Sequence, residues 1–318
     1  MKKSFDVSKF SHFSIILIIF IVLFSVNVGA TEPEGFNLEN ERYSLSITPK
    51  LLEDGAQNDL SFNLFYTDEM KFGGEIRLRT IKTSGLGDIW EITDSMLTLK
   101  NETYEAFVLP LNYQFIRGDN FSLRVGLGAY YNFNKSASRG YFNDSSLYEP
   151  EGPDNYNAYV NDFSAHAVGP MLDVDFSLKW KFLYISFSGG VTPVFYFNQS
   201  QSLLLSPLMG PSLFSVAGGS ASGPYYYLNL DVSFNILNYA CIFITLFNEY
   251  SRLSYESIGF IESGGWAAVN ITEVYKTFAL EVSLLINLKA DGFMPLIGYG
   301  RTLDGKNYFM LGVKKLGI

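Results

Sequence analysis

Apolar and polar residues alternate with a period of two over much of the chain. From Phe121 to Phe133 every odd position is apolar, whereas the even positions include Ser122, Arg124 and Asn132. Similar alternation runs through 104–116, 225–237 and 272–288. Successive side chains of a strand point to opposite faces, so the pattern predicts strands with one apolar and one mixed polar face.

The same rule applied to the rest of the chain predicts about twelve strands. Most of them have the roughly 9–11 residues that a tilted strand needs to cross a bilayer. The predicted strands lie near 41–51, 59–67, 74–82, 104–116, 121–134, 163–178, 182–197, 225–237, 240–252, 272–288, 293–302 and 307–317.

The predicted connections alternate between short and long. The short ones are 68–73, 117–120, 179–181, 238–239 and 289–292, and the long ones include 83–103, 135–162, 198–224 and 253–271. This alternation is typical of hairpins that cross a membrane with tight turns on one side and free loops on the other. Strands in hydrocarbon must also pair all their backbone groups, and only a closed barrel achieves that. The sequence therefore predicts an all-β fold, a transmembrane antiparallel up-and-down β-barrel of about twelve strands.

The N-terminal segment reads as a signal peptide. Lys2 and Lys3 precede an apolar run over 13–28, and the small residue Ala30 follows it at a cleavage position. The run is short for a helix that spans a bilayer, which takes about 20 residues. We expect a cleaved signal peptide over 1–30, which would place the mature protein outside the cytoplasm.

The amino-acid composition excludes several classes of protein and of functional site. The chain has 47% hydrophobic and 17% charged residues, which excludes a disordered protein. Its single Cys excludes an internal disulfide, and its two histidines exclude a multi-histidine metal site. A net charge of −9 gives no reason to expect nucleic acid as a partner. No metal and no cofactor are expected.

The signal peptide, the hairpin array, the aromatic-rich alternation and the final strand over 307–318 together resemble bacterial outer-membrane β-barrel proteins of porin-like architecture. The resemblance implies an outer-membrane location with a periplasmic C-terminus. It also implies outer-membrane lipid and the barrel-insertion machinery as partners. In this arrangement 31–40 is a short periplasmic N-terminal segment, and 41–318 is the barrel with long extracellular loops.

Strand parity assigns a set of charged residues to the lumen. Arg124 and Asp175 lie at similar distances from neighbouring turns, so a cross-strand ion pair between them is expected. Because charges on the lipid face are destabilising, their position on the polar face supports the assignment. The lumen candidates are Arg77, Arg79, Arg124, Asp173, Asp175, Asp231, Glu249 and Glu281, with Glu75 and Lys314.

Aromatic residues are expected at the membrane boundaries. Trp180, between Lys179 and Lys181, is predicted to be an interfacial anchor. Tyr130, Tyr131 and the tyrosines at 225–227 are expected in an outer aromatic girdle.

Several functions fit this architecture. The leading hypothesis is a narrow channel or transporter for small solutes. A barrel that acts through its extracellular loops, by adhesion or structural anchoring, is an alternative, and so is uptake of hydrophobic solutes, suggested by the uncharged, leucine-rich connection 198–224. An enzyme ranks last: His166 is expected on the outer face, and Asp173 and Asp175 lack a partner across a cleft.

Overall fold

The computed structural model describes residues 43–66, 71–87, 95–117, 120–142, 159–180, 183–205, 212–236, 240–261, 265–286 and 293–317. The predicted signal peptide lies outside these residues. Within them, no helix is long and apolar enough to span a membrane. The strands are β1 (Tyr43–Leu52), β2 (Gly55–Phe65), β3 (Phe72–Gly87), β4 (Ser95–Arg117), β5 (Phe121–Phe142), β6 (Tyr159–Trp180), β7 (Leu183–Thr192), β8 (Phe195–Leu205), β9 (Ser212–Ser222), β10 (Tyr225–Ile236), β11 (Ala240–Ile261), β12 (Gly265–Ile286), β13 (Phe293–Thr302) and β14 (Asn307–Gly317).

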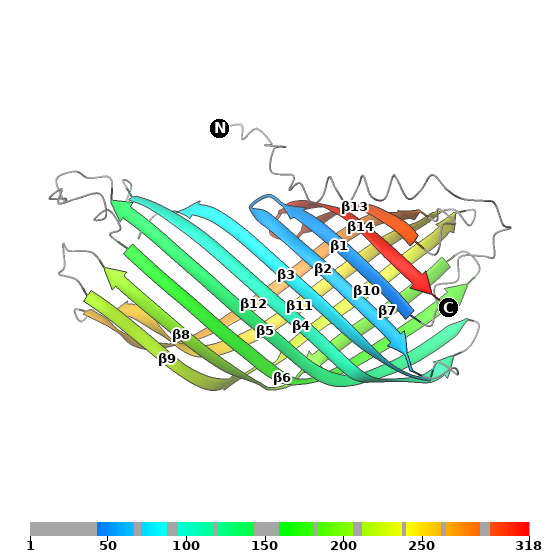
Figure 1. Cartoon of the computed structure of the whole chain (residues 1–318), viewed down its shortest axis with the longest axis horizontal. Coiled ribbons are helices and arrows are strands. Elements are labelled where there is room, and N and C mark those ends of the chain that lie inside the picture. The colour runs from blue at the N-terminus through cyan, green and yellow to red at the C-terminus, as the bar shows by residue number, and fades with distance from the viewer. Residues whose placement is uncertain are drawn as a thin grey trace.

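These fourteen segments form a twelve-stranded antiparallel barrel, because two pairs of segments each make one interrupted strand. β7 and β8 pair with successive parts of β6, and β10 and β9 continue the same hairpin alongside them. The barrel closes where β1 pairs with β14. Figure 1 shows the tilted strands of the near wall crossing those of the far wall. The predicted fold class is confirmed.

The outer surface carries rows of exposed apolar side chains. Leu111, Leu127 and Leu172 lie directly opposite one another on β4, β5 and β6, and each is more than 40% exposed. On the other side of the barrel, Val282, Tyr299 and Phe309 form a similar row on β12, β13 and β14. This is the inverse of a soluble β-domain and suits a wall that faces acyl chains.

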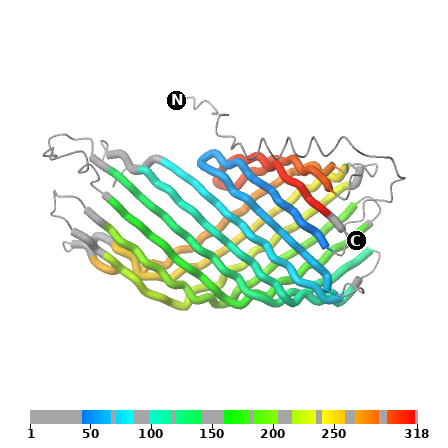
Figure 2. Tube along the Cα trace, viewed as in Figure 1, coloured from blue at the N-terminus to red at the C-terminus, as the bar shows by residue number. Residues whose placement is uncertain are grey.

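The strands differ in length by a factor of about two. β1 and β13 have 10 residues each, whereas β5, β6, β11 and β12 have 22. We call the end that holds the β2–β3, β4–β5, β6–β7, β10–β11 and β12–β13 connections the turn end, and the opposite end the loop end. The long strands continue toward the loop end well past the β1–β2 hairpin (Figure 2).

Much of the predicted long connections is strand. Residues 83–87 belong to β3, 95–103 to β4, 135–142 to β5, 159–162 to β6, 253–261 to β11 and 265–271 to β12. The prediction of a free apolar loop over 198–224 is wrong, because 198–205 and 212–222 form β8 and β9. A strand that extends beyond the bilayer no longer needs an apolar outer face, so the alternation fades while the ladder continues.

A bulge in β4 reverses the predicted parity of part of that strand. The register with β5 shifts between Val108 and Leu111, around Pro110, which has no N–H to donate. Phe107 and Leu109 are therefore buried inside the barrel at 5% and 0% exposure, although the alternation placed them on the outer face.

The interior holds an aromatic cluster. Tyr130, Tyr225 and Tyr227 are at most 4% exposed and pack with Phe107 and Phe195. The expectation that these three tyrosines belong to an outer girdle is wrong. Their side chains share strand parity with Asn132 and Asp231, which face the same interior.

Candidate functional site

Arg77 lies at the centre of an ion-paired cluster near the turn end of the lumen. Its guanidinium Nη2 lies 2.8 Å from Asp173 on β6, and its Nε lies 3.1 Å from Glu75 on the same strand. The hydroxyl of Tyr227 contacts both Arg77 and Asp173. β3, β6 and β10 are not neighbours in the wall, so these contacts cross the interior.

The predicted ion pair between Arg124 and Asp175 is confirmed. The two residues lie directly opposite each other on β5 and β6, and Arg124 Nε donates to Asp175 at 2.8 Å. Arg124 Nη2 also reaches Glu75 at 3.0 Å, which joins this pair to Arg77. We call Arg77, Arg124, Glu75, Asp173, Asp175 and Tyr227 the Arg77 cluster.

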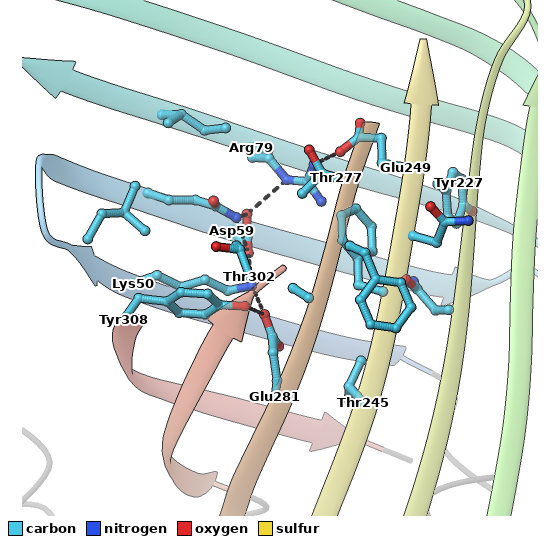
Figure 3. A pocket seen from close by; sticks show the side chains of 18 of the residues that line it. Lys50, Asp59, Arg79, Tyr227, Thr245, Glu249, Thr277, Glu281, Thr302 and Tyr308 are labelled. Atoms are coloured by element: carbon cyan, nitrogen blue, oxygen red, sulfur yellow. Dashed lines mark hydrogen bonds and ion pairs between the residues drawn. The ribbon is translucent and has the colours of Figure 1, made fainter. Parts of the chain in front are cut away.

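Arg79 organises a second set of contacts farther toward the loop end. Its Nη1 lies 3.1 Å from Glu105 on β4 and 3.2 Å from Glu249 on β11, and its Nε lies 3.4 Å from Asp59 on β2. Tyr225 donates a hydrogen bond to Glu249 at 2.8 Å. We call these five residues the Arg79 cluster. Figure 3 shows Arg79 and Glu249 pointing toward one another from opposite walls.

Lys50 extends the Arg79 cluster toward β12. Its ammonium lies 3.1 Å from Asp59 and 2.6 Å from Glu281, and the hydroxyl of Tyr308 donates to Glu281 at 2.7 Å. The Arg77 cluster and the Arg79 cluster, with Lys50 and Glu281, together comprise four cations and seven carboxylates, a formal excess of three negative charges. The cations are Lys50, Arg77, Arg79 and Arg124, and the carboxylates are Asp59, Glu75, Glu105, Asp173, Asp175, Glu249 and Glu281.

Aromatic rings fill the space around the two clusters. Tyr130 and Tyr225 stack with their ring centroids 4.2 Å apart and their planes 9° apart. The guanidinium of Arg77 lies 5.0 Å from the ring centroid of Tyr227 and 5.5 Å from that of Phe107. Cations over aromatic faces are favoured, most strongly where water is excluded. Rings and ion pairs together therefore fill the part of the lumen that lies beside the first cavity.

Two cavities meet at the Arg79 cluster. The first, of about 760 Å³, contacts β11 from Thr245 to Glu249 and reaches the rim at Asp304. The second, of about 610 Å³, contacts β11 from Glu249 to Ser257 and lies farther toward the loop end. Tyr225 and Glu249 line both cavities, so the Arg79 cluster forms the partition between them.

The remaining sequence candidates lie elsewhere. Asp231 accepts hydrogen bonds from Thr245 and from Ser186 at 3.5 Å, toward the turn end of the lumen. The backbone of Trp180 pairs with Leu183 at the end of β6, and its side chain lies outside the described residues, so its role as an anchor stays a prediction.

His166 is on the outer face, away from the lumen carboxylates. Its ring stacks on Phe133 with centroids 4.5 Å apart, and its Nδ1 lies 2.9 Å from the Tyr131 hydroxyl. Asp173 and Asp175, in contrast, contact arginines inside the barrel. The structure thus does not bring His166 together with these two aspartates.

The sequence reasoning missed Glu105, Asp59 and Lys50, although all three contact the charged network. Glu105 shares parity with Phe107, so only the bulge at Pro110 turns it inward. A proline inside a well-patterned strand is the signal that could have revealed this reversal.

No protein-family model matches the sequence, and no match is found among curated proteins. Among solved structures, the chain is similar to the translocator domain of the autotransporter NalP from Neisseria meningitidis, at 11% identity over 97% of both chains with a TM-score of 0.46. It is also similar to the toluene transporter TbuX from Ralstonia pickettii, at 7% identity over 88% of this chain and 91% of that one, with a TM-score of 0.44.

A third similar structure is the outer membrane protease OmpT from Escherichia coli, at 9% identity over 90% of this chain and all of that chain, with a TM-score of 0.40. By their names, these three barrels are a translocator domain, a transporter and a protease. The function of this chain therefore has to be inferred from its own residues.

Proposed function

We propose that the protein is a narrow, gated channel or transporter for small solutes in a bacterial outer membrane. The observation that carries this proposal is the partition at Arg79, where two lumen cavities of about 760 and 610 Å³ meet. The cavities supply space for a solute on each side of the barrier. The barrier consists of side chains, which rearrange more readily than a plug of folded backbone.

The charge balance favours cations and neutral polar solutes. The two clusters, with Lys50 and Glu281, hold four cations against seven carboxylates, so the summed formal charge of these lumen groups is −3. Rings of acidic side chains favour cations in channels generally. We therefore propose a preference for small cationic and neutral solutes over anions.

The outer-membrane location, with the C-terminus in the periplasm, is part of the same proposal. The location is supported by the exposed apolar rows on the outer face, and the orientation by the longest connection, 143–158, which joins β5 to β6 at the loop end. In this orientation the loop end faces the outside, where the first cavity reaches the rim at Asp54 and Asp304 and the second cavity lies along the longer strands.

An enzymatic role ranks behind transport. Arg77 and Arg124 contact Asp173 and Asp175, and His166 lies on the opposite face of the wall. An adhesive role through the connection 143–158 depends on residues outside the described part of the chain.

Planar-bilayer recording of the purified protein tests the proposal. We expect discrete small conductance steps that are larger with potassium glutamate than with choline chloride, since potassium is the small cation in the first salt. A protein that inserts and shows no conductance in either salt would contradict the channel.

A further inference from the structure

The second cavity lies in the part of the barrel that the distal halves of the long strands form. It is lined by inward-facing residues such as Asn134 on β5, Tyr255 on β11 and Tyr275 on β12. At this level the outer face carries polar pairs such as Glu256 and Asn270, which suit a wall that faces water. The cavity volume of about 610 Å³ falls within the roughly 300–1,000 Å³ of small-molecule sites in proteins. The cavity is therefore large enough for a small molecule that arrives from the aqueous side.

Tyr275 presents an open aromatic face to this cavity. Its side chain shares strand parity with Ala279, which is buried in the interior, and yet Tyr275 is 53% exposed. In the part of the chain that the structure describes, no other aromatic ring packs against it. The interior tyrosines Tyr130 and Tyr225, in contrast, stack on each other. The ring of Tyr275 is therefore free to stack on an apolar face of a ligand.

Tyr255 extends the aromatic surface from β12 to β11. Its ring lies 5.9 Å from that of Phe163 and 5.6 Å from that of Phe197, measured between centroids, so packing against β6 and β8 fixes its position. In the register of β11 and β12, Glu273 lies between the positions of Tyr255 and Tyr275. The Tyr275 hydroxyl donates a hydrogen bond to Glu273. This wall of the cavity thus combines two aromatic rings with one carboxylate.

Glu273 differs from the other acidic residues that line the cavity. Glu105 and Glu249 share Arg79, at 3.1 and 3.2 Å, and Glu102 lies 3.4 Å from Lys82. Among the described residues, no cation pairs with Glu273. Its carboxylate can therefore accept hydrogen bonds from a hydroxyl or an ammonium group of a ligand.

The wall across the lumen from β12 carries side-chain amides. Asn132 Nδ2 donates to Glu105 at 3.0 Å, and the side chain of Asn134 makes no hydrogen bond to another described residue. An amide has two donors and one acceptor, so it can bond a hydroxyl group in either sense. The amides that line the cavity are Asn101, Asn132, Asn134, Asn161 and Gln201.

An open aromatic face, a set of amides and an unpaired carboxylate together fit a sugar. A pyranose ring has a face of C–H groups that can stack on an aromatic ring, and its hydroxyls both donate and accept. An apolar ligand would leave the amides without partners, and so would a small organic cation such as choline. Glu273 attracts an ammonium group on the sugar and repels a carboxylate.

We propose that the second cavity is a binding site for sugars without acidic groups, and that it binds amino sugars more tightly than neutral ones. Tyr275 stacks on the sugar ring, Asn134 and its neighbouring amides bond the hydroxyls, and Glu273 pairs with the ammonium. As the solute class of the proposed channel, this inference rests on that function, although binding itself can be measured without conduction.

Saturation-transfer NMR with the purified protein tests the site. The protein is kept in a polyoxyethylene detergent, which has no sugar headgroup, and its aromatic protons are irradiated. The probes are glucosamine, galactosamine and mannosamine, with the parent hexose and the uronic acid of each. Choline is the probe for a site that binds organic cations in general.

We expect saturation to reach the C–H protons of at least one hexosamine. Its Kd should be about two- to fivefold lower than that of the parent hexose, because of the added ion pair. Absence of binding by all three hexosamines and their parent hexoses would overturn the site. Choline that binds as tightly as the best sugar would overturn the sugar class, and a uronic acid that binds as tightly as its parent hexose would overturn the role of Glu273.

Two variants with matched controls locate the bound sugar. Tyr275→Ala should weaken binding about tenfold, whereas Tyr196→Ala should leave it unchanged, because Tyr196 is 55% exposed on the outer face of β8. Glu273→Gln should raise the Kd of the hexosamine to that of the hexose, whereas Glu256→Gln on the outer face of β11 should keep the difference. A heat-modifiable gel shift shows that each variant is folded. Equal losses in a variant and its control would overturn the placement of the sugar in this cavity.

Planar-bilayer recording separates this inference from the proposed channel. A hexosamine added at the loop end should interrupt the current of the wild type and not that of Tyr275→Ala. A protein that conducts ions and binds no sugar would overturn the sugar site and leave the channel supported. A protein that binds sugars and does not conduct would contradict the channel and still support the second cavity as a sugar site.

Discussion

Arg79 and Glu249 bond across the lumen at 3.2 Å, although 170 positions separate them in the chain. Arg79 is on β3 and Glu249 is on β11, and no ladder joins these two strands. The bond therefore ties together opposite sides of the wall at the level where the two cavities meet. Its rearrangement is the step that a solute path between the two cavities requires.

Replacing Arg79 with glutamine should open the path between the two cavities. The substitution leaves Asp59, Glu105 and Glu249 without the cation they share, so the formal charge of the Arg79 cluster changes from −2 to −3. We expect a larger conductance and a stronger preference for cations, measured in planar bilayers by step size and by reversal potential in a salt gradient. The control is Lys306→Gln at the rim, where the ammonium contacts Asp54 at 3.3 Å in an exposed position. Equal conductance and selectivity in both variants would contradict the partition.

Tyr225 should act in the partition through its ring more than through its hydroxyl. Tyr225→Ala removes the ring that stacks on Tyr130 and lines both cavities, so the cavities should merge and conductance should rise. Tyr225→Phe keeps the ring and removes only the bond to Glu249, so its conductance should stay close to the wild type. A phenylalanine variant as conductive as the alanine variant would show that the hydroxyl, and not the ring, closes the path.

The pair Arg124 and Asp175 should behave as a coupled unit in stability measurements. Arg124→Met leaves Asp175 without its partner, and Asp175→Leu leaves Arg124 with Glu75 alone, so each variant should lower the free energy of unfolding, the first by about 1.5–3 kcal/mol and the second by less. The double variant should recover a large part of the loss, because no unpaired charge remains at this position. Urea unfolding in lipid vesicles, followed by Trp fluorescence, gives the three values. Strictly additive losses would argue against the coupling.

One pair of substitutions to arginine can test whether the outer face of the barrel wall contacts hydrocarbon. Leu280 is 44% exposed on the outer face of β12, and Leu303 is 80% exposed in the β13–β14 turn. If the outer face contacts hydrocarbon, Leu280→Arg should lower stability in vesicles by about 2–4 kcal/mol, whereas Leu303→Arg should have an effect near zero. Unfolding in urea compares the two, and two small effects would contradict contact of this face with the bilayer core.

The sequence predicts the barrel well where the wall faces apolar surroundings. The strands 293–302 and 307–317 coincide with β13 and with β14, and the alternation over 121–133 gives the correct face for Leu127 and Asn132. In these segments the outer side chains must be apolar, so the alternation of apolar and polar residues predicts both the strand and the direction of each side chain. In the distal halves of the long strands polar pairs such as Glu256 and Asn270 lie on the outer face, and that signal is lost.

The sequence predicts many of the residues of the candidate site, but it does not predict which of them contact one another. Parity selects Arg79 and Glu249 separately, but their contact depends on the closure of the barrel and on the tilt of its strands. Likewise, a single bulge at Pro110 moves Glu105 from the expected outer face to the lumen. Tyr225 and Tyr227 were assigned by residue type to a girdle, when their parity with Asp231 already indicated the interior.

The unequal strand lengths make the loop end of this barrel oblique, and the first cavity reaches the rim on its low side, at Asp54 and Asp304. If strands of the length of β1 span the bilayer, the ends of the long strands β5, β6, β11 and β12 extend above the membrane surface and form a wall on one side of the barrel. Molecules that diffuse along the membrane surface would reach the low rim from one side of the barrel only, because the long strands block their approach from the other side. Access to the first cavity would therefore be asymmetric. Membrane proteins that pack against the low rim would reduce solute entry without contacting any residue of the lumen.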